Sequence, residues 1–406
     1  MNQDQGFIVT VDLHYPEDVQ NNTIDLPLAP TPMEVNEEEW SEYMKSLWTK
    51  LNNKKSYKSG TKLLLTHKNK ERYTVHHAAL KYYVAKGLEI TNVHEGIFFY
   101  QDNYFSPYVK FHTKCRSEAK DKATKNMHKL CLNSLYGKSI QNVRKYTKTK
   151  FVRNKKLFIK YTHNPMCDSF FSIWKDAIVV TLKNSDVVLD KAIYIGQCVL
   201  DLSKITMYKL WDEWQSNPLC DKVELIGGDT DSFFLKVVSS YSQDVILKSF
   251  ENVFNPVDPS TRGIFDSSNY STDHSLFSTC NQAKLGCFKD EACGNFIDEF
   301  ICLCPKAYSF LMVKKENEQQ EEKKYERKNA AKGVKRYKAK RLSHEHYRRV
   351  YEHHKIQTVV QTLLKSTHHA MRTTKMAKNA LSIWESKRVW LDHNVSVPYG
   401  FHGTMK

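Results

Sequence analysis

The sequence predicts an α+β fold that combines an antiparallel sheet, a helical insertion and a helix-rich end. Three observations support this fold class. Two apolar runs rich in β-branched and aromatic residues flank a tight Gly-Gly-Asp-Thr-Asp-Ser core in "VELIGGDTDSFFLKVV" (223–238), which predicts an antiparallel hairpin. Residues 107–142 are strongly basic with a helical pattern. Beyond about residue 314 the composition changes sharply to Lys, Glu, Gln and Arg, which marks the start of a terminal subdomain.

The N-terminal hundred residues predict mixed strands and helices. The alternating run "FIVTVDL" (7–13) is typical of a strand, and the four prolines of 14–32 indicate an extended surface segment. Residues 62–75 predict a hairpin, 76–87 a helix that ends at Gly87, and 89–101 a pair of strands.

The rest of the chain alternates between the two kinds of element. Short strands are predicted at 148–154, 156–162, 286–292 and 300–313, and a helix at 241–254. A long helix at 192–215 is expected to pack under the 223–238 hairpin. The charged run 314–341 mixes both signs, so we expect much of it to be a solvated loop.

Charge and composition narrow the function classes. Lys and Arg outnumber Asp and Glu by 61 to 45, giving a formal net charge of +16 and a pI near 9.2. Such a chain favours a polyanionic partner, with nucleic acid ahead of an anionic membrane surface. No apolar run is long enough to span a bilayer and the first residues do not resemble a signal peptide, so we expect a soluble intracellular protein with no membrane partner. The ten cysteines lack paired C-x-x-C spacing, which favours reduced thiols over a zinc site.

A basic helix face is the first chemical feature. Lys125, Lys129 and Asn133 are spaced by four, so a helix places them on one face. A solvated basic face would explain this pattern equally well. The following "NSLYG" favours a functional surface, because its glycine lets another backbone approach. Arg116 adds a guanidinium that can contact phosphate in a bidentate way.

The second feature is the pair of carboxylates, Asp229 and Asp231, at the tip of the predicted hairpin. Asp and Gly are ordinary turn residues, so the motif could be turn chemistry alone. Two close carboxylates, however, favour a bound cation, and Mg²⁺ or Mn²⁺ accepts one or two carboxylates together with substrate phosphates. A basic helix for a triphosphate and an acidic hairpin for a metal are the two halves of phosphoryl transfer.

These residues carry a family resemblance. "KLCLNSLYG" (129–137) resembles the K-x-x-x-N-S-x-Y-G motif of family B DNA polymerases, and "GGDTDS" (227–232) resembles their metal-binding hairpin. "PKAYSF" (305–310) is similar to their K-x-Y motif, and "AAKGVKR" (330–336) to a run that often follows it. Residues 63–94, "VLDLSKITMY" (199–208) and "LGCFKDEACGNFIDEF" (285–300) resemble the protein-primed polymerases of Maverick/Polinton elements and related viruses.

The resemblance implies a role for each matching residue. Asp231 would be the main ligand of the catalytic metals, Mg²⁺ or Mn²⁺, with Asp229 in support. The remaining assignments follow the motifs: Lys129, Lys125 and Arg116 would hold the dNTP triphosphate, Asn133 and Tyr136 would line the nascent base pair, and Lys306, Tyr308, Gly137 and Lys332 would contact the primer or DNA.

The resemblance also implies a right-hand domain plan. Residues 1–100 would be a partial palm and lead-in, 101–145 the fingers helices, 146–313 the palm with the D-T-D-S hairpin and K-x-Y motif, and 314–406 a helix-rich thumb. The family also needs an aspartate in an upstream D-x-x-S-L-Y-P motif, and only "VDLHYP", with Asp12, approaches it. We therefore expect an N-terminally truncated polymerase that also lacks the exonuclease domain, rather than one in which Asp12 supplies the missing ligand.

Two hypotheses follow from this reading. The chain is a DNA-directed DNA polymerase acting on primer–template DNA, with a terminal protein primer and the missing N-terminal portion as further partners, in a nucleus or at a viral replication site. Alternatively, it is a catalytically inactive remnant that still binds nucleic acid through phosphates. A nuclease using the same carboxylates is less favoured, because the sequence has no further acidic or histidine motif nearby.

Overall fold

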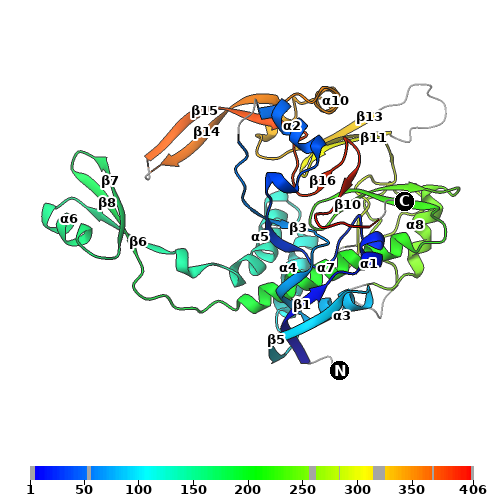
Figure 1. Cartoon of the computed structure of the whole chain (residues 1–406), viewed down its shortest axis with the longest axis horizontal. Coiled ribbons are helices and arrows are strands. Elements are labelled where there is room, and N and C mark those ends of the chain that lie inside the picture. Colours follow the sequence, from blue (N-terminus) through cyan, green and yellow to red (C-terminus); the bar gives the residue numbers. More distant parts are fainter. Residues whose placement is uncertain are drawn as a thin grey trace. The chain divides into compact units, whose positions relative to one another are not determined.

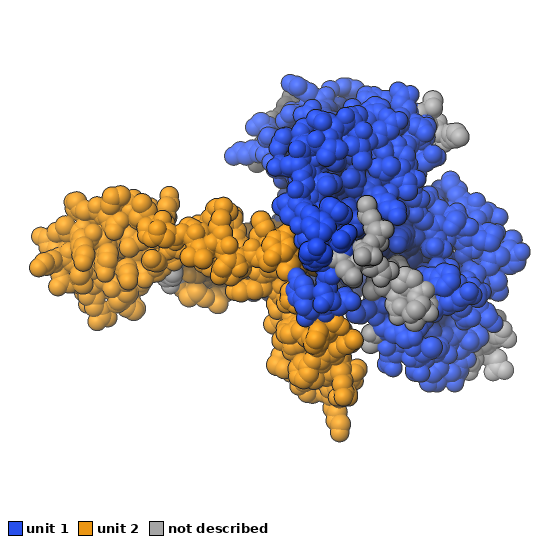
Figure 2. All heavy atoms as spheres, turned by 90° about the horizontal axis from the view of Figure 1, so that it is seen from below, with its two compact units in different colours: residues 1–104, 200–359, 379–406 blue, residues 105–199, 360–378 orange. Residues whose placement is uncertain are grey.

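The computed structural model describes residues 5–52, 56–255, 262–282, 284–313, 325–367 and 370–403. The chain divides into two compact units (Figure 2). Unit 1 comprises residues 1–104, 200–359 and 379–406, and unit 2 comprises residues 105–199 and 360–378. The first part of the predicted charged run, 314–324, lies outside the described residues.

Unit 1 begins with a three-stranded antiparallel sheet in which β1 lies between β4 and β5. Figure 1 labels β1 and β5 of this sheet. Its strands are β1 (Gln5–His14), β4 (Lys70–His76) and β5 (Glu89–Tyr100). The predicted strand at 7–13 is confirmed, but the hairpin at 62–75 is wrong: β3 (Thr61–Leu64) pairs with β2 (Thr31–Glu34), whereas β4 pairs with β1. Residues 89–101 form one strand rather than two. The first error concerns which strands pair, and hydrogen-bond pairing between strands is non-local.

A helical layer covers this sheet. Helix α3 (His77–Ala85) ends as predicted before Gly87, whose φ of +104° suits glycine. Its Tyr83 is fully buried with Val11 and Leu13 of β1. The predicted surface segment at 14–32 is wrong, because it contains α1 (Glu17–Asn22) and buries Leu28 in the same core. Pro16 occupies the N-cap of α1, where a missing N–H does no harm.

The predicted hairpin at 223–238 is confirmed as β9 (Lys222–Gly228) and β10 (Phe233–Val238). The long helix α7 (Ile193–Gln215) packs against it as expected: Trp211 lies 6.3 Å from Phe233 between ring centroids. Helix α8 (Gln243–Ser249) and the 3-10 turn η3 (Phe250–Asn252) complete this core.

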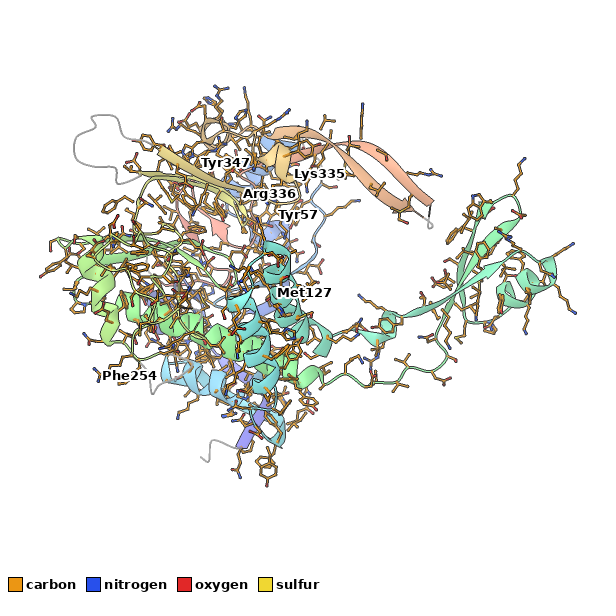
Figure 3. All side chains as sticks on the ribbon, turned by 180° about the vertical axis from the view of Figure 1, so that it is seen from behind. Tyr57, Met127, Phe254, Lys335, Arg336 and Tyr347 are labelled. Carbon is orange, nitrogen blue, oxygen red and sulfur yellow. The ribbon has the colours of Figure 1, made fainter. Side chains whose placement is uncertain are left out.

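A second three-stranded antiparallel sheet, ordered β11–β12–β13, lies in the same unit. Its strands are β11 (Phe296–Cys304), β12 (Ala307–Val313) and β13 (Tyr325–Ala331). The strand predicted at 286–292 is wrong: only an isolated bridge joins Phe265 and Phe288 there. Helices α9 (Arg336–Ala339) and α10 (His344–His353) follow, and the fully buried Tyr347 of α10, labelled in Figure 3, donates to the Ala330 carbonyl at 2.9 Å.

The expectation of a helix-rich end is wrong for the described residues. After α10 the chain forms only strands: β14 (Gln357–Thr367), β15 (Ala370–Leu381), β16 (Val389–Trp390) and β17 (Ser396–Val397). Runs such as "TVVQT" explain this, since β-branched side chains favour strands. The Trp384 ring then packs on the rings of Trp40, which follows η1 (Glu37–Glu39), and Trp48, which lies on α2 (Glu42–Asn52). The ring centroids of Trp40 and Trp48 lie 4.8 and 4.7 Å from that of Trp384. This aromatic cluster ties the C-terminal residues to the N-terminal ones.

Unit 2 contains the predicted basic helices and a small sheet. The helices are α4 (Ser106–Glu118) and α5 (Lys122–Ser139), followed by the turn η2 (Val143–Lys145). Asp121 caps α5 by accepting from the Thr124 N–H at 2.8 Å. Strands β6 (Thr147–Val152), β7 (Cys167–Trp174) and β8 (Ala177–Lys183) form an antiparallel sheet with β8 in the centre.

The strand predicted at 156–162 is instead helix α6 (Lys155–Thr162). Asn154 caps it, accepting from the Lys156 N–H at 2.7 Å. Phe158 and Tyr161, three residues apart, then pack against the buried Val180 of β8. A helix therefore buries both rings on one face, which a strand would not do. Among all the helices of the described residues, none combines the length and hydrophobicity needed to cross a membrane.

Candidate functional site

The loop between β9 and β10 holds two carboxylates at the tip of the hairpin. The Asp229 N–H donates to the Ser232 carbonyl at 3.0 Å, and the Asp231 N–H donates to the Asp229 carbonyl at 2.7 Å. Thr230 between them has φ of +60°, a left-handed conformation that is rare for a β-branched residue. Such local strain persists where the surrounding structure fixes it, and it is frequent at functional sites.

The two carboxylates differ in their partners. Lys306, in the turn between β11 and β12, places its Nζ 3.0 Å from Asp229 Oδ1. Asp231 is exposed, and its side chain makes no hydrogen bond or ion pair within the part of the chain that the structure describes. Sequence reasoning missed the Asp229–Lys306 pair, because the two residues belong to different hairpins far apart along the chain.

The predicted primer-contacting residues of unit 1 gather around this hairpin. Tyr308 of β12 lies 4.8 Å from Phe234 of β10 between ring centroids. Burial raises the pKa of Tyr308, and the negative charge of Asp229 raises it further. The Lys332 N–H donates to the Lys306 carbonyl at 3.1 Å. The structure therefore brings Asp229, Lys306, Tyr308 and Lys332 together.

The donor set suits a hard divalent cation. Two carboxylates at an exposed turn match Mg²⁺ or Mn²⁺, which keep their remaining positions for water and substrate phosphates. No group of three or more His, Cys, Asp or Glu side chains that could hold a metal occurs among the described residues.

Asp12 has local partners of its own. Its Oδ1 accepts from the Arg72 backbone N–H at 2.7 Å and lies 2.8 Å from His94 Nε2. These contacts lower the pKa of Asp12, and the Arg72 N–H contributes most. Because Arg72 is on β4 and His94 on β5, Asp12 connects all three strands of the first sheet.

Unit 2 carries the predicted nucleotide-binding residues. Lys125, Lys129 and Asn133 are all exposed on α5, and their spacing confirms a shared helix face. Arg116 is exposed in the last turn of α4. Tyr136 is half-buried. A Cβ added at Gly137 would meet no atom within 4 Å, so the surface beside it is open.

Contacts between α4 and α5 fix the position of this basic face within unit 2. The Tyr108 hydroxyl donates to the Cys131 carbonyl at 3.3 Å. His112 Nδ1 lies 2.9 Å from Nδ1 of the buried His128, so one ring donates and the other accepts. Sequence reasoning did not single out this histidine pair, because nothing in a sequence shows that two rings from different helices face each other.

Comparison with known proteins adds independent information. Residues 31–217 match the family model described as "DNA polymerase type B, organellar and viral". A comparison with curated proteins found no significant match. The fold is similar to that of phi29 DNA polymerase, solved as a ternary complex with primer–template DNA and incoming nucleotide substrates, with 14% identity and a TM-score of 0.50.

The phi29 match covers 93% of this chain and 58% of that polymerase, so the chain spans just over half of its length. At this level of identity the match concerns the fold, a mixture of helices and antiparallel sheets. The family match covers residues 31–217, a little under half of the chain, and includes the motif on α5, so this part of the chain is similar to type B DNA polymerases of the organellar and viral kind.

Proposed function

We propose that the chain catalyses template-directed transfer of a deoxynucleotide to a primer 3′-hydroxyl by two-metal chemistry. The observation that carries this proposal is the hairpin tip, where Asp229 and Asp231 lie at a strained turn beside Lys306. The fold similarity to a polymerase solved with primer–template DNA supports such DNA as the partner and deoxynucleotides as the substrates.

Asp231 and Asp229 would hold Mg²⁺ or Mn²⁺. Cations held there would supply activation of the primer hydroxyl and neutralisation of charge on the leaving pyrophosphate. The exposed carboxylate of Asp231 is available for this task, whereas Asp229 already has an ammonium partner. Asp231 is accordingly the principal ligand and Asp229 the supporting one.

The other residues bind and orient the substrates. The Lys306 side chain is 44% exposed, so its ammonium can turn from Asp229 to a phosphate of the primer strand. Tyr308, held against Phe234, would contact the primer near its end, and the exposed Lys332 and Gly137 would face the DNA.

On unit 2, the α5 face would bind the incoming nucleotide. Lys125 and Lys129, with Arg116, supply cations for the triphosphate. Asn133 and Tyr136, one turn further along α5, would line the nascent base pair. All of these side chains except the half-buried Tyr136 are exposed, so they are available to a ligand.

The proposal includes the domain plan. Residues 1–100 would contribute part of the palm, 101–145 the fingers, 146–313 the palm with both hairpin motifs, and 314–406 the thumb. The Maverick/Polinton-like motifs support priming by a terminal protein and a replicating virus or mobile element as the setting.

Primer extension on a primed single-stranded template tests this function. We expect incorporation by the full chain with Mg²⁺ or Mn²⁺, and a loss of roughly 10³-fold or more for Asp231→Asn, since metal ions supply several kcal/mol of transition-state stabilisation. Asp221→Asn is the matched control, because Asp221 is exposed at the opposite end of the same hairpin. Equal activity of wild type and Asp231→Asn would refute the metal assignment.

A second function is an inactive remnant that binds nucleic acid. One observation favours it: Asp12, the nearest match to the family's upstream aspartate, is already engaged by Arg72 and His94. DNA binding that falls steeply with salt, without incorporation under any metal, would support the remnant. Incorporation that is lost in both Asp231→Asn and Asp12→Asn would instead make Asp12 a metal ligand.

A further inference from the structure

Residues 147–183 of unit 2 form a small basic module with its own core. Helix α6 covers one face of the β6–β8–β7 sheet, where Val152, Val180 and Leu182 are buried. The module carries eight basic and two acidic side chains, a formal charge of +6 with histidine neutral: Lys148, Lys150, Arg153, Lys155, Lys156, Lys160, Lys175 and Lys183 against Asp168 and Asp176.

The opposite face of this sheet carries aromatic rings. In the strand register Phe151 of β6 and Phe171 of β7 both pair with Val179 of β8, so all three share one face, and Trp174 pairs with Ala177 on the same face. Phe151 is 52% exposed and Trp174 61% exposed, whereas Val179 and Ala177 beneath them are buried. We call Phe151, Phe171 and Trp174 the aromatic face.

The two most exposed rings meet across the central strand. Phe151 and Trp174 lie 6.5 Å apart between centroids, nearly perpendicular to each other, and the small Ala177 gives them room. The guanidinium of Arg153 lies 5.5 Å from the centre of the Phe151 ring. Large aromatic side chains left half or more exposed on a folded sheet indicate an interaction surface.

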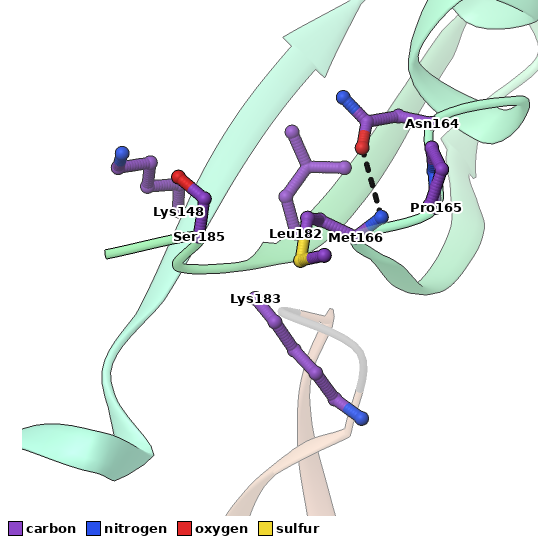
Figure 4. A pocket seen from close by; sticks show the side chains of 7 residues that line it. All are labelled: Lys148, Asn164, Pro165, Met166, Leu182, Lys183 and Ser185. Atoms are coloured by element: carbon purple, nitrogen blue, oxygen red, sulfur yellow. Dashed lines mark hydrogen bonds between the residues drawn. The ribbon is translucent and has the colours of Figure 1, made fainter. Parts of the chain in front are cut away.

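Cations border the same sheet at one end. A pocket of about 360 Å³ is lined there by Lys148, Lys183 and Ser185 with Asn164, Pro165 and Met166 (Figure 4). Lys183 lies on the strand that carries Val179, and its Nζ is 3.4 Å from the exposed Asp168. Lys148 pairs with Leu182 on the face that α6 covers, whereas Lys183 alternates onto the face of Val179. The aromatic face therefore combines rings that can stack with two cations, Lys183 and Arg153, that can contact phosphates.

We propose that the aromatic face binds single-stranded DNA, with bases stacked on Trp174 and Phe151 and phosphates contacted by Arg153 and Lys183. The charge of +6 favours a polyanion over an apolar protein partner. The rings favour a single strand over a duplex, because only unpaired bases offer free faces for stacking. This inference concerns a surface separate from the carboxylate hairpin and goes beyond nucleotide transfer.

The test is fluorescence anisotropy of labelled oligodeoxythymidylate with the full chain, without nucleotide or divalent metal. We expect Trp174→Ala and Phe151→Ala each to weaken binding roughly tenfold, with unchanged salt dependence. Arg153→Gln should lower the salt slope by about one. Phe170→Ala is the matched control, because Phe170 is 56% exposed on the same strand but faces α6, where its ring meets Phe158.

Trp174 emission provides a readout specific to this surface. Oligodeoxythymidylate should quench the tryptophan emission of the wild type. The quenching that comes from Trp174 should vanish in Trp174→Phe, while the affinity for the oligonucleotide is retained. Unchanged affinity in both alanine variants would overturn the proposal, and so would an equal loss of duplex binding, which would indicate a phosphate-only surface. Equal melting temperatures of the variants and the wild type would exclude unfolding as the cause of weaker binding. Since neither metal nor nucleotide is present, the outcome is independent of polymerase activity.

Discussion

Removal of the Lys306 charge is the sharpest perturbation of the hairpin. Lys306 Nζ is 3.0 Å from Asp229 Oδ1, and the two side chains are 44% and 37% exposed. In Lys306→Gln the two carboxylates of the tip lose this ammonium, so a divalent cation no longer competes with it. We therefore expect Mn²⁺ to bind the DNA-free protein more tightly, even though a basic residue that should contact primer has been removed.

The magnitude follows from the exposure of the pair. Two unit charges at this distance attract by about 1.4 kcal/mol in bulk water, and exposed ion pairs retain roughly 0.2–1 kcal/mol after screening and loss of side-chain freedom. A competing interaction of up to about 1 kcal/mol corresponds to a decrease of up to about fivefold in the Kd for Mn²⁺. The free energy of unfolding should fall by no more than the same amount.

The assay is a Mn²⁺ titration of the full chain, followed by electron paramagnetic resonance. Lys332→Gln is the control, because it removes an exposed charge while keeping the backbone N–H that bonds Lys306. The control should bind Mn²⁺ as wild type does and primer–template DNA less tightly. Unchanged or weaker Mn²⁺ binding in Lys306→Gln would refute the competition between ammonium and metal.

Three further predictions concern stability, measured as the free energy of unfolding in urea. Asp201 is 3% exposed, and its Oδ2 accepts a hydrogen bond from the His76 N–H at 2.9 Å. Asp201→Ala should therefore lower the free energy of unfolding by about 2 kcal/mol, and Asp201→Asn, which keeps an acceptor oxygen, should lower it less. Equal losses in the two variants would contradict this prediction. The Arg348 guanidinium lowers the pKa of Glu299, so the Glu299 carboxylate stabilises the fold above its ordinary pKa of 4.5, and this contribution disappears as the pH falls through the lower pKa of the folded state. Glu299→Gln should remove that part of the acid sensitivity of the free energy of unfolding, and an unchanged dependence on acid pH would contradict this prediction. Burial lowers the pKa of Lys70 from 10.5 to about 7, so between these pH values the unfolded state binds more protons than the folded state. The free energy of unfolding should therefore rise between pH 7 and 10.5, by at most about 5 kcal/mol. Lys70→Met should flatten this rise, and an unchanged slope in that variant would refute the prediction.

Local patterns predicted the elements whose signals are contained within a few residues. The β9–β10 hairpin followed from two apolar runs around a turn, and α5 from the spacing of Lys125, Lys129 and Asn133. The same patterns failed where an apolar run could satisfy two structures. Residues 156–162 looked like a strand, but the Asn154 cap and the packing of Phe158 against β8 select a helix.

Strand pairing was the other source of error. Residues 62–75 have the composition of a hairpin, yet β4 pairs with β1 and β3 with β2. The C-terminal residues were expected to be helical, and β14 and β15 are strands there. Backbone hydrogen bonds between strands form over long distances in the chain, so composition does not reveal the partner.

The sequence alone determined the residue patterns on which the proposed chemistry depends: two carboxylates at a turn, a basic helix face and motifs that resemble those of type B DNA polymerases. Residue type and short-range spacing carry that information. Only the tertiary structure decided that Lys306 pairs with Asp229, that Asp12 connects three strands, and that Phe151 meets Trp174 on an open sheet face. Each of these contacts joins residues from different elements, and packing rather than local sequence brings such residues together.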